Sequence, residues 1–388
     1  MPTPISVADH QRIAGRRLPK IVFDYLEGGA LDEQTVRANL TDLAQVRLQQ
    51  RILRDVSSIS LKHSVLGRTV GSPVLISPMG LLSLFGRGAD VAMARAAKAA
   101  GSIFVHSAWS GTSLTEVAAA APGAVWAQLS IWKDARLTEE HLQRAASAGV
   151  EVLVVAGDVA VSSKRDRDLH NGFGMTTVPT VRGALNAARK PRWLSNLLFG
   201  PRISFGDQSV DGRPMGLAQM HRFMDENENG GVTWADIAAL RARWPGKLVV
   251  KGVMSGEDAR MARDAGVDGV FVSNHGGRQF DGQPSTTHAL TEVAEAVAGE
   301  VEILVDGGIR RGADVVKLTA LGATACLIGR PAVYGLVSDG EAGVAAVLQL
   351  LAEEARTAIA FAGETRLDSI RPTAIAGRPA SLATARFP

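Results

Sequence analysis

The sequence predicts an α/β fold: a (β/α)8 TIM barrel with an N-terminal helical extension and a long loop after the fourth strand. Eight short apolar segments recur along the chain, and Ala-rich segments with helical periodicity lie between them. Near-continuous apolar segments are typical of strands buried on both faces, and their alternation with helices indicates a barrel. A doubly wound open sheet is the alternative, but it does not naturally give eight regular units.

Each predicted strand ends in Gly, Ser, Pro or a polar residue. The eight strands are Val74–Pro78, Ile103–Ser107, Val125–Ser130, Val152–Asp158, Lys247–Gly252, Gly269–Asn274, Ile303–Gly308 and Ala323–Arg330. The helical segments between them include Ala89–Ala100, Thr138–Ala148, Gly256–Ala265, Leu290–Ala298 and Ala313–Leu321. We expect one domain over residues 1–388, with the barrel at about 70–365.

Three further segments complete the expected organisation. The part before the first strand is mainly helical, including Asp24–Leu40, and Gly340–Ala362 is a long amphipathic helix. The interval between the fourth and fifth strands is much longer than the others, which predicts an insertion at about 172–232. Its Val178–Asp207 part mixes basic, aromatic and apolar residues, so it is a candidate lid or docking surface, including one for a membrane headgroup layer.

Composition excludes several classes of protein. The chain has 388 residues, is 46% hydrophobic and carries a net charge of +3 with scattered basic residues, so we expect no nucleic-acid partner. The single cysteine, Cys326, lies in an apolar segment and is interpreted as a core residue. A chain that cannot form an internal disulfide fits a reducing, cytoplasmic compartment. Neither a signal peptide nor an uninterrupted apolar membrane span is evident.

Polar groups occupy the ends of the predicted strands. Barrel enzymes build their sites from the C-terminal ends of their strands, and polar groups placed there without a function would cost stability. Each residue alone is compatible with a structural cap, but the set favours an active site. The set comprises Ser107, Gln128, Ser130, Asp158, Lys251, Ser273, Asn274, His275, Asp306 and Arg330.

The last two strand ends predict a phosphate site. Asp306–Gly312 follows the seventh strand, and Gly329-Arg330-Pro331 follows the eighth. Glycines let backbone N–H groups approach an anion, and arginines supply charge and forked donors. Turn glycines with solvated arginines would explain one such loop, but two loops at this position favour phosphate binding.

His275 is the candidate general base. A lone histidine is usually structural, but Arg278 follows three residues later and Asp158 lies two strands away around the predicted barrel. A base beside an anion-binding arginine is what removal of a proton or hydride from a carboxylate substrate requires. Asp158 would orient the imidazole and stabilise its protonated form.

At these residues the sequence resembles the FMN-dependent α-hydroxy acid dehydrogenase/oxidase family, which includes glycolate oxidase, L-lactate dehydrogenase and (S)-mandelate dehydrogenase. Besides Ser273–Gln279, the resemblance covers Leu18-Pro19-Lys20, Tyr25–Ala30, Val305–Gly312 and Gly329-Arg330-Pro331, and so nearly the whole chain. It implies oxidation of an (S)-2-hydroxy acid to the 2-oxo acid (class EC 1.1), with hydride transfer to N5 of FMN. Quinone or O2 would re-oxidise the flavin, and a homotetramer is implied.

The resemblance also implies a role for each site residue. His275 would be the base paired with Asp158, Arg278 and Arg165 would bind the substrate carboxylate with Tyr25, and Lys251 would stabilise the reduced flavin. No metal is expected. The residues implied in cofactor binding are Pro78, Met79, Gly80, Ser107, Gln128, Lys251, Ser273, Asp306, Gly308, Arg310, Gly329 and Arg330.

One position departs from the family pattern. Many members carry a substrate-facing tyrosine two residues after Gln128, and this chain has Ser130 there. The loss of a phenol removes a hydrogen-bond donor and opens space, which indicates a substrate bulkier than lactate or a slower enzyme. The alternatives are an FMN enzyme of the same fold acting on a larger biosynthetic or peptide-derived substrate, and a non-redox barrel that binds a phosphate ligand.

Two segments indicate the branch of the family. Asp158–Val161 with Arg165–Asn171 resembles mandelate dehydrogenase, and Pro191–Leu194 resembles the bacterial lactate dehydrogenases. These branches favour quinone as electron acceptor, and Gly80, where oxidases often have alanine, points the same way. Besides a lid, residues 172–232 are a candidate for contact with the inner face of the cytoplasmic membrane.

Overall fold

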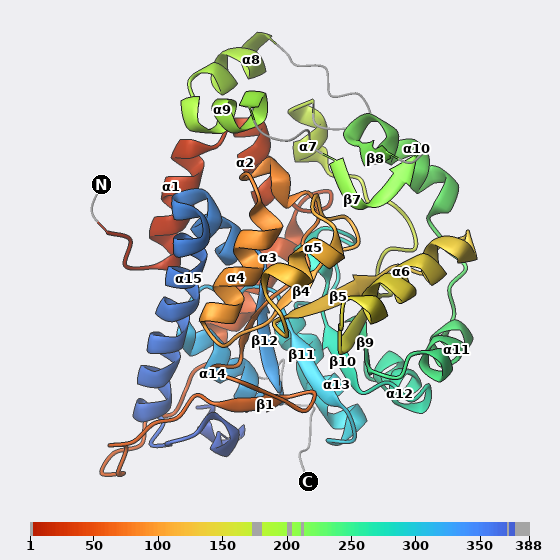
Figure 1. Ribbon diagram of the computed structural model, residues 1–388. Helices are drawn as coiled ribbons and strands as arrows, with labels where there is room; N and C mark the ends of the chain where they lie inside the picture. Colours follow the sequence, from red (N-terminus) through yellow and green to blue (C-terminus); the bar gives the residue numbers. More distant parts are fainter. Residues whose placement is uncertain (1–2, 173–180, 200–203, 211–212, 371, 377–388) are drawn as a thin grey trace.

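Eight parallel strands close into a barrel at the centre of the computed structural model (Figure 1). The structure describes residues 3–172, 181–199, 204–210, 213–370 and 372–376. Around the barrel the strands follow one another as β10 (Gly269–Val272), β11 (Glu302–Val305), β12 (Ala325–Ile328), β3 (Val74–Ile76), β4 (Phe104–His106), β5 (Val125–Leu129), β6 (Val152–Ala156) and β9 (Lys247–Val253). This confirms the predicted fold class and all eight predicted strands.

Both faces of the barrel strands are buried, which explains why the strands are apolar throughout. Alternate residues such as Leu75, Val105 and Trp126 point into a cluster that fills the barrel interior. Their neighbours, such as Ile76 and Phe104, belong to the layer between strands and helices. The short hairpin of β1 (His63–Val65) and β2 (Arg68–Val70) contributes Val65 and Val70 to the interior cluster, so it closes the N-terminal end of the barrel.

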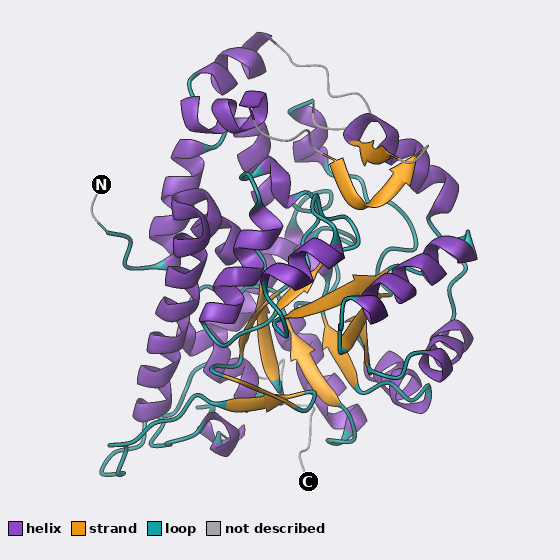
Figure 2. Cartoon of the chain, viewed as in Figure 1, coloured by secondary structure: helices purple, strands orange, loops and turns teal. Residues whose placement is uncertain are grey.

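Helices surround the barrel on the outside (Figure 2). They are α4 (Ala89–Ala99), α5 (Leu114–Ala120), α6 (Ala135–Ser147), α11 (Trp234–Arg243), α12 (Gly256–Asp264), α13 (Thr286–Val297) and α14 (Gly312–Ala320). Several begin at a serine whose hydroxyl accepts a backbone N–H of the first turn, as Ser113, Ser255 and Ser285 do. These caps satisfy amides that have no partner within the helix, so they fix where each helix begins.

The N-terminal extension differs from the prediction. The sequence predicts helical structure across Asp24–Leu40, but the chain forms α1 (Val7–Arg17), α2 (Lys20–Glu27) and α3 (Gln34–Gln45), with a break between the last two. Within the break, a Cβ on Gly29 would lie 2.7 Å from the carbonyl oxygen of Gly277, so a larger residue would clash. The break therefore lets the N-terminal extension touch the turn that carries the predicted base.

The C-terminal helix α15 (Arg330–Phe361) begins ten residues before the predicted start at Gly340. Asp339 and Gly340 have non-helical backbone angles, so the helix is broken at the point where the prediction placed its beginning. Among the described residues α15 is the one helix long and apolar enough to cross a membrane. It packs along the barrel against α1, α4 and α14, as the core helix of a globular protein does.

The insertion between β6 and β9 carries secondary structure of its own. It contains α7 (Asp166–His170), α8 (Val181–Ala188), α9 (Pro191–Phe199), the hairpin β7 (Ser204–Val210) with β8 (Arg213–Gly216), and α10 (Leu217–Asn227). α8 and α9 lie at the top of Figure 1, at the opposite end of the molecule from β1. Part of the Val178–Asp207 segment predicted as a docking surface lies outside the described residues.

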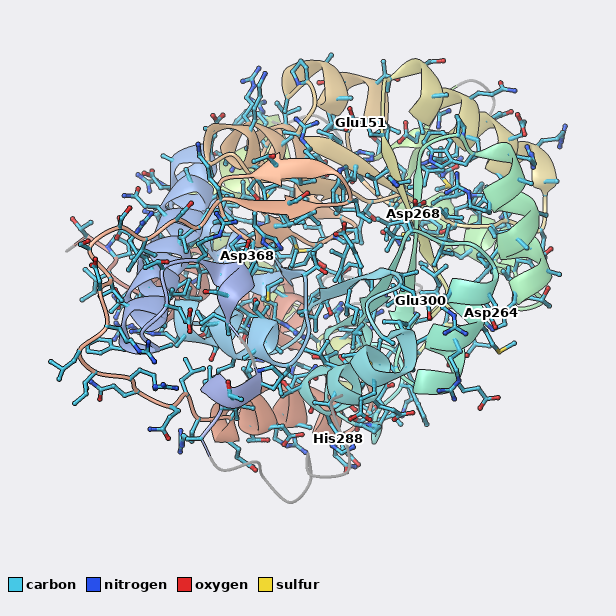
Figure 3. All side chains as sticks on the ribbon, turned by 90° about the horizontal axis from the view of Figure 1, so that it is seen from below. Glu151, Asp264, Asp268, His288, Glu300 and Asp368 are labelled. Atoms are coloured by element: carbon cyan, nitrogen blue, oxygen red, sulfur yellow. The ribbon has the colours of Figure 1, made fainter. Side chains whose placement is uncertain are left out.

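Charged groups on the N-terminal end of the barrel are paired with one another. Asp268 bonds to Arg241 (2.7 Å) and Lys247 (2.8 Å), and Glu300 bonds to Arg263 (3.0 Å). Figure 3 shows this face from below, with Asp268 and Glu300 labelled. Pairs of this kind contribute little individually, about 0–1 kcal/mol. Barrel enzymes build their sites at the opposite end, from the C-terminal ends of the strands.

Candidate active site

A cavity of about 1350 Å³ occupies the C-terminal end of the barrel. Ligand sites usually measure about 300–1,000 Å³, so this cavity can hold more than one small molecule. It is lined by all of the predicted site residues except Asp158, Ser273 and Asn274. The structure therefore brings together residues that are up to about 300 positions apart in the sequence.

Three side chains meet at the predicted base. The Nδ1 atom of His275 lies 3.0 Å from Oδ2 of Asp158, and Nζ of Lys251 lies 3.3 Å from the same oxygen and 3.4 Å from Nδ1. Burial favours a protonated Asp158, but Lys251 and His275 outweigh it and hold the pKa of this carboxyl well below its usual range. The carboxylate is therefore charged and keeps Nδ1 engaged, which leaves Nε2 for the cavity.

His275 is a neutral imidazole at neutral pH. Its burial and the adjacent ammonium of Lys251 lower its pKa, and together they exceed the opposite influence of Asp158. A neutral histidine beside a charged carboxylate is prepared to accept a proton, because the imidazolium that forms is stabilised by that carboxylate.

The turn that carries His275 has a left-handed backbone. His275 (φ 56°), Gly276 (φ 64°) and Gly277 (φ 76°) all have positive φ. For a residue other than glycine such a conformation costs about 1–3 kcal/mol, so the surroundings must enforce it. Asn274 does so: its Oδ1 accepts the N–H of Gly277 (3.1 Å), and its amide exchanges two 2.8 Å hydrogen bonds with Asn39. The two glycines therefore allow the turn that points the base into the cavity.

Asn39 and Ser273 show where sequence reasoning was incomplete. Asn39 was not identified, because its partner Asn274 is 235 residues away and no local motif marks the pair. Ser273 is fully buried, and its hydroxyl accepts the N–H of His275 (3.1 Å), so it supports the turn. Its assignment to the cofactor stays a prediction.

Two guanidinium groups lie beside the base. Arg278 donates from Nη1 to the carbonyls of Tyr25 (2.7 Å) and Gly28 (2.8 Å), and its guanidinium lies 4.7 Å from the centroid of the Tyr25 ring. Nε of Arg165 donates to the carbonyl of Arg278 (3.4 Å). Burial and the charge of Arg278 lower the pKa of Arg165 to about 10, so it is still a cation at neutral pH. Two close cations beside a tyrosine form a site suited to a carboxylate.

The other end of the cavity fits the flavin mononucleotide that the sequence resemblance implies. Asp306 accepts a hydrogen bond from the Ser77 hydroxyl on Oδ2 (2.9 Å), while its buried Oδ1 has no partner among the described residues. A ribityl hydroxyl would supply the missing donor. Gly307 and Gly308 continue the loop with positive φ, and α15 begins at Arg330, so backbone N–H groups from both strand ends are available to a phosphate.

The arginine side chains at this end donate hydrogen bonds to backbone carbonyls. The Arg330 guanidinium donates to the carbonyls of Leu26 (2.9 Å), Gly28 (2.9 Å) and Gly276 (3.0 Å). Arg310 donates to the Ile309 carbonyl (2.9 Å). In this structure the Arg330 side chain fastens α2 and the His275 turn to the barrel. The binding of the phosphate by Arg330 stays a prediction.

An aromatic wall forms the side of the cavity near β4 and β5. Trp109 packs edge-on against Trp132, Phe205 and Phe223, with ring centroids 5.3, 5.7 and 6.1 Å away. Phe205 and Phe223 come from the insertion, which had no sequence pattern linking it to the barrel. A Cβ on Gly80 would lie 2.9 Å from Cβ of Trp109, so the small residue at position 80 makes room for this wall.

The chain is similar along most of its length to characterised proteins. Residues 14–377 match the family described as FMN-dependent dehydrogenase. An L-lactate dehydrogenase of Stenotrophomonas maltophilia (strain K279a) is 40% identical over 96% of this chain and 98% of its own. An L-lactate dehydrogenase of Xanthomonas campestris pv. campestris (strain B100) is 41% identical over 92% of this chain and 93% of its own.

Solved structures agree with these relatives. The crystal structure of the monotopic membrane protein (S)-mandelate dehydrogenase is 36% identical, with a TM-score of 0.93 over 96% of this chain and 99% of that one. A mandelate oxidase structure with (S)-4-hydroxymandelic acid is also 36% identical, with a TM-score of 0.83 over 95% of this chain and 98% of that one.

Proposed function

Because this chain belongs to the FMN-dependent dehydrogenase family, and thus to enzymes that use FMN to oxidise 2-hydroxy acids, we propose that it oxidises an (S)-2-hydroxy acid with His275 as the base. The observation that carries the proposal is the contact of His275 with Asp158 and Lys251 beside two guanidinium groups. Family membership also excludes the non-redox alternative, since the family is defined by its redox cofactor.

Each group at the site contributes one part of the reaction. Arg278 and Arg165 bind and orient the carboxylate with the help of Tyr25, which places the substrate hydroxyl at Nε2 of His275. His275 takes the hydroxyl proton, and Asp158 stabilises the imidazolium that results. FMN, when bound, accepts the hydride from the α-carbon. Lys251 supplies positive charge at the place where the cofactor gains negative charge.

The residues proposed to hold FMN follow the cavity wall from β3 to β12. Asp306 and the backbone of Gly308, Arg310, Gly329 and Arg330 would bind the ribityl phosphate, and Gln128 and Ser107 would bind the ring edge. Pro78, Met79 and Gly80 would support one face of the ring. The lactate and mandelate dehydrogenases among the relatives support an (S)-2-hydroxy monocarboxylic acid as the substrate. The resemblance of Asp158–Val161 and Pro191–Leu194 to the dehydrogenase branches favours quinone as the acceptor.

The proposed acceptor agrees with an apolar surface on α8 and α9. Leu185, Leu197, Leu198 and Phe199 are exposed, the last by 78%, and the basic residues Arg189, Lys190 and Arg192 flank them. Such a combination suits the boundary between headgroups and acyl chains. The similarity to a monotopic membrane protein supports the proposal that α8 and α9 rest on the membrane, from which a quinone would reach the flavin.

Anaerobic flavin reduction tests the proposed chemistry. The FMN-loaded protein is mixed with the (S)- and (R)-enantiomers of lactate and mandelate, and the visible absorbance of the oxidised flavin is followed. We expect bleaching by (S)-acids, and a rate reduced about 10²- to 10⁴-fold in His275→Gln. A full rate in His275→Gln would remove the base from the mechanism, and an FMN-loaded protein that no 2-hydroxy acid reduces would overturn the proposed function.

A further inference from the structure

The cavity extends past the residues assigned above to cofactor and carboxylate. The extension, called here the side-chain lobe, is lined by Ile131, Trp132, Val159, Met220, Met224, Val232, Trp234 and Ile237. In the ring of strands, β5 and β6 lie opposite β11 and β12, whose loops form the phosphate end. Since Ile131, Trp132 and Val159 follow β5 and β6, the lobe lies across the barrel mouth from the phosphate, and the cofactor does not account for it.

The lobe is apolar and adaptable. Trp132 is 4% exposed and packs edge-on against Phe223 of α10, with ring centroids 5.4 Å apart. Met220 and Met224 stand one helical turn apart on α10, so both side chains lie on the same face of that helix. Methionine and tryptophan side chains adapt to flat or flexible apolar groups, which are the chemistry this lobe can bind.

The charges around the lobe disfavour an acidic side chain. Glu228 and Asp258 line this side of the cavity, and the nearby ammonium of Lys164 is paired with Asp166 at 2.8 Å. A second carboxylate on the substrate would therefore meet negative charge, and no unpaired cation of the lobe would compensate it within the described part of the chain. The occupant is uncharged beyond its single carboxylate.

Ser130 connects the lobe to the reacting centre. It lines the cavity two residues after Gln128, and its hydroxyl bonds to no other described residue. The family tyrosine expected here would fill the passage with a phenol ring, whereas serine leaves it open. The opening lets a group attached to the α-carbon continue from the His275 site into the lobe.

We infer that the substrate is a 2-hydroxy monocarboxylic acid whose side chain is large, uncharged and apolar, an arylalkyl group or an extended alkyl chain. The inference rests on the proposed function, since it places the carboxylate at Arg165 and Arg278 and the hydroxyl at His275. It goes further in assigning the lobe and Ser130 as the determinants of side-chain size.

Substrate competition tests the inference on the FMN-loaded enzyme. The kcat/KM for anaerobic flavin reduction is measured with (S)-lactate, (S)-malate, (S)-3-phenyllactate and (S)-2-hydroxyoctanoate. We expect the two bulky acids to exceed lactate by about tenfold or more, and malate to be poorest. Ser130→Tyr should lower the ratio of bulky acid to lactate by about tenfold or more.

A second variant keeps the test independent of the folding of Ser130→Tyr. Met224→Trp fills the lobe from α10 and should lower the same ratio, while Met261→Trp, on the exposed side of α12, should leave it unchanged. A wild-type preference for lactate, or a ratio unmoved by both Ser130→Tyr and Met224→Trp in folded, yellow protein, would overturn the inference and leave the proposed function standing. Flavin reduction by none of the acids would instead overturn the proposed function.

Discussion

Asp158 and Lys251 act on His275 in opposite directions. The carboxylate raises the pKa of the imidazole and the ammonium lowers it, and with burial the balance is a lowered pKa. The base is therefore available in its neutral form below the pH at which an ordinary histidine would be half protonated. The acid limb of kcat/KM, where the base becomes protonated, reports this balance.

Changes at these two residues should move the acid limb in opposite directions. Asp158→Asn removes the influence that raises the pKa of His275, so the limb moves to lower pH and the rate falls about 10²- to 10⁴-fold as the imidazolium loses its carboxylate. Lys251→Met removes an influence that lowers it, so the limb moves to higher pH. The pH profile of flavin reduction in both variants measures the shifts, and movement in the same direction would contradict the account.

Gly80 provides a second prediction at this scale. A Cβ there would lie 2.9 Å from Cβ of Trp109, whereas a Cβ on Gly86 would meet only Leu336 at 3.9 Å. Gly80→Ala should lower the free energy of unfolding by about 1–3 kcal/mol through overpacking, while Gly86→Ala should change it by less than about 0.5 kcal/mol. Thermal unfolding of the holoenzyme measures both, and equal Tm values for the two variants would argue against the crowding.

The residues that sequence reasoning could identify share one property. His275, Lys251 and Asp306 stand at the ends of apolar strands, and a barrel gathers those ends by geometry alone. Asn39, Met220 and Met224 stand on helices of the extension and the insertion, whose placement against the barrel follows no local periodicity. The partners of Arg330 were also unpredictable, because a strand-end arginine gives no sign of whether its donors face a ligand or buried carbonyls.

Among the secondary-structure elements, strands were predicted more accurately than helix ends. Strands buried on both faces are nearly continuous apolar segments, whereas no local pattern predicted the breaks after Glu27 and at Asp339–Gly340. The insertion was predicted as a long loop, but it contains helices and the β7–β8 hairpin. Its hairpin is nevertheless fixed: Oδ1 and Oδ2 of Asp207 in β7 both accept the N–H of Leu114 at 3.1 Å.

The proposed membrane contact is testable through α9. Leu198→Ser combined with Phe199→Ser removes exposed apolar area next to basic residues, so binding to phosphatidylglycerol-containing vesicles should fall about tenfold or more. Ile52→Ser with Leu53→Ser changes two apolar residues elsewhere that are also exposed, by 73% and 98%, and serves as the control. Co-sedimentation with vesicles gives the readout, and similar binding by both double variants would place the contact elsewhere. Turnover with a soluble electron acceptor should be the same in both.

At the scale of the whole molecule, the N-terminal extension and the barrel depend on each other. Arg330, at the start of α15, donates to carbonyls of the α2–α3 break and of the His275 turn. Arg330→Lys keeps the charge but loses the forked geometry of the guanidinium, so some buried carbonyls are left without a hydrogen-bond donor. Each such carbonyl lowers the free energy of unfolding by about 1–3 kcal/mol. We expect a Tm lower by roughly 5 °C or more and weaker FMN retention. Arg366→Lys changes a surface arginine that is paired with Asp368 and serves as the control. Equal Tm values for the Arg330→Lys and Arg366→Lys variants would contradict the proposed role of the Arg330 hydrogen bonds.

The homotetramer and the single-domain assignment over residues 1–388 remain predictions. Light scattering of the purified enzyme measures the first. For the second, a cooperative loss of flavin absorbance, far-UV signal and tryptophan fluorescence in one transition is expected if extension, barrel and insertion unfold together.

The Arg330 contact also bears on how the protein is made. Leu26 leaves the ribosome 304 residues before the arginine that will hold it, an interval of about 15 s or longer at ~5–20 residues per second. Throughout that interval the face of α1 that packs against α15 is uncovered, because α15 has not yet been synthesised. The C-terminal mouth of the barrel is consequently completed only near the end of translation, when Arg330 can bond to the carbonyls of Leu26, Gly28 and Gly276.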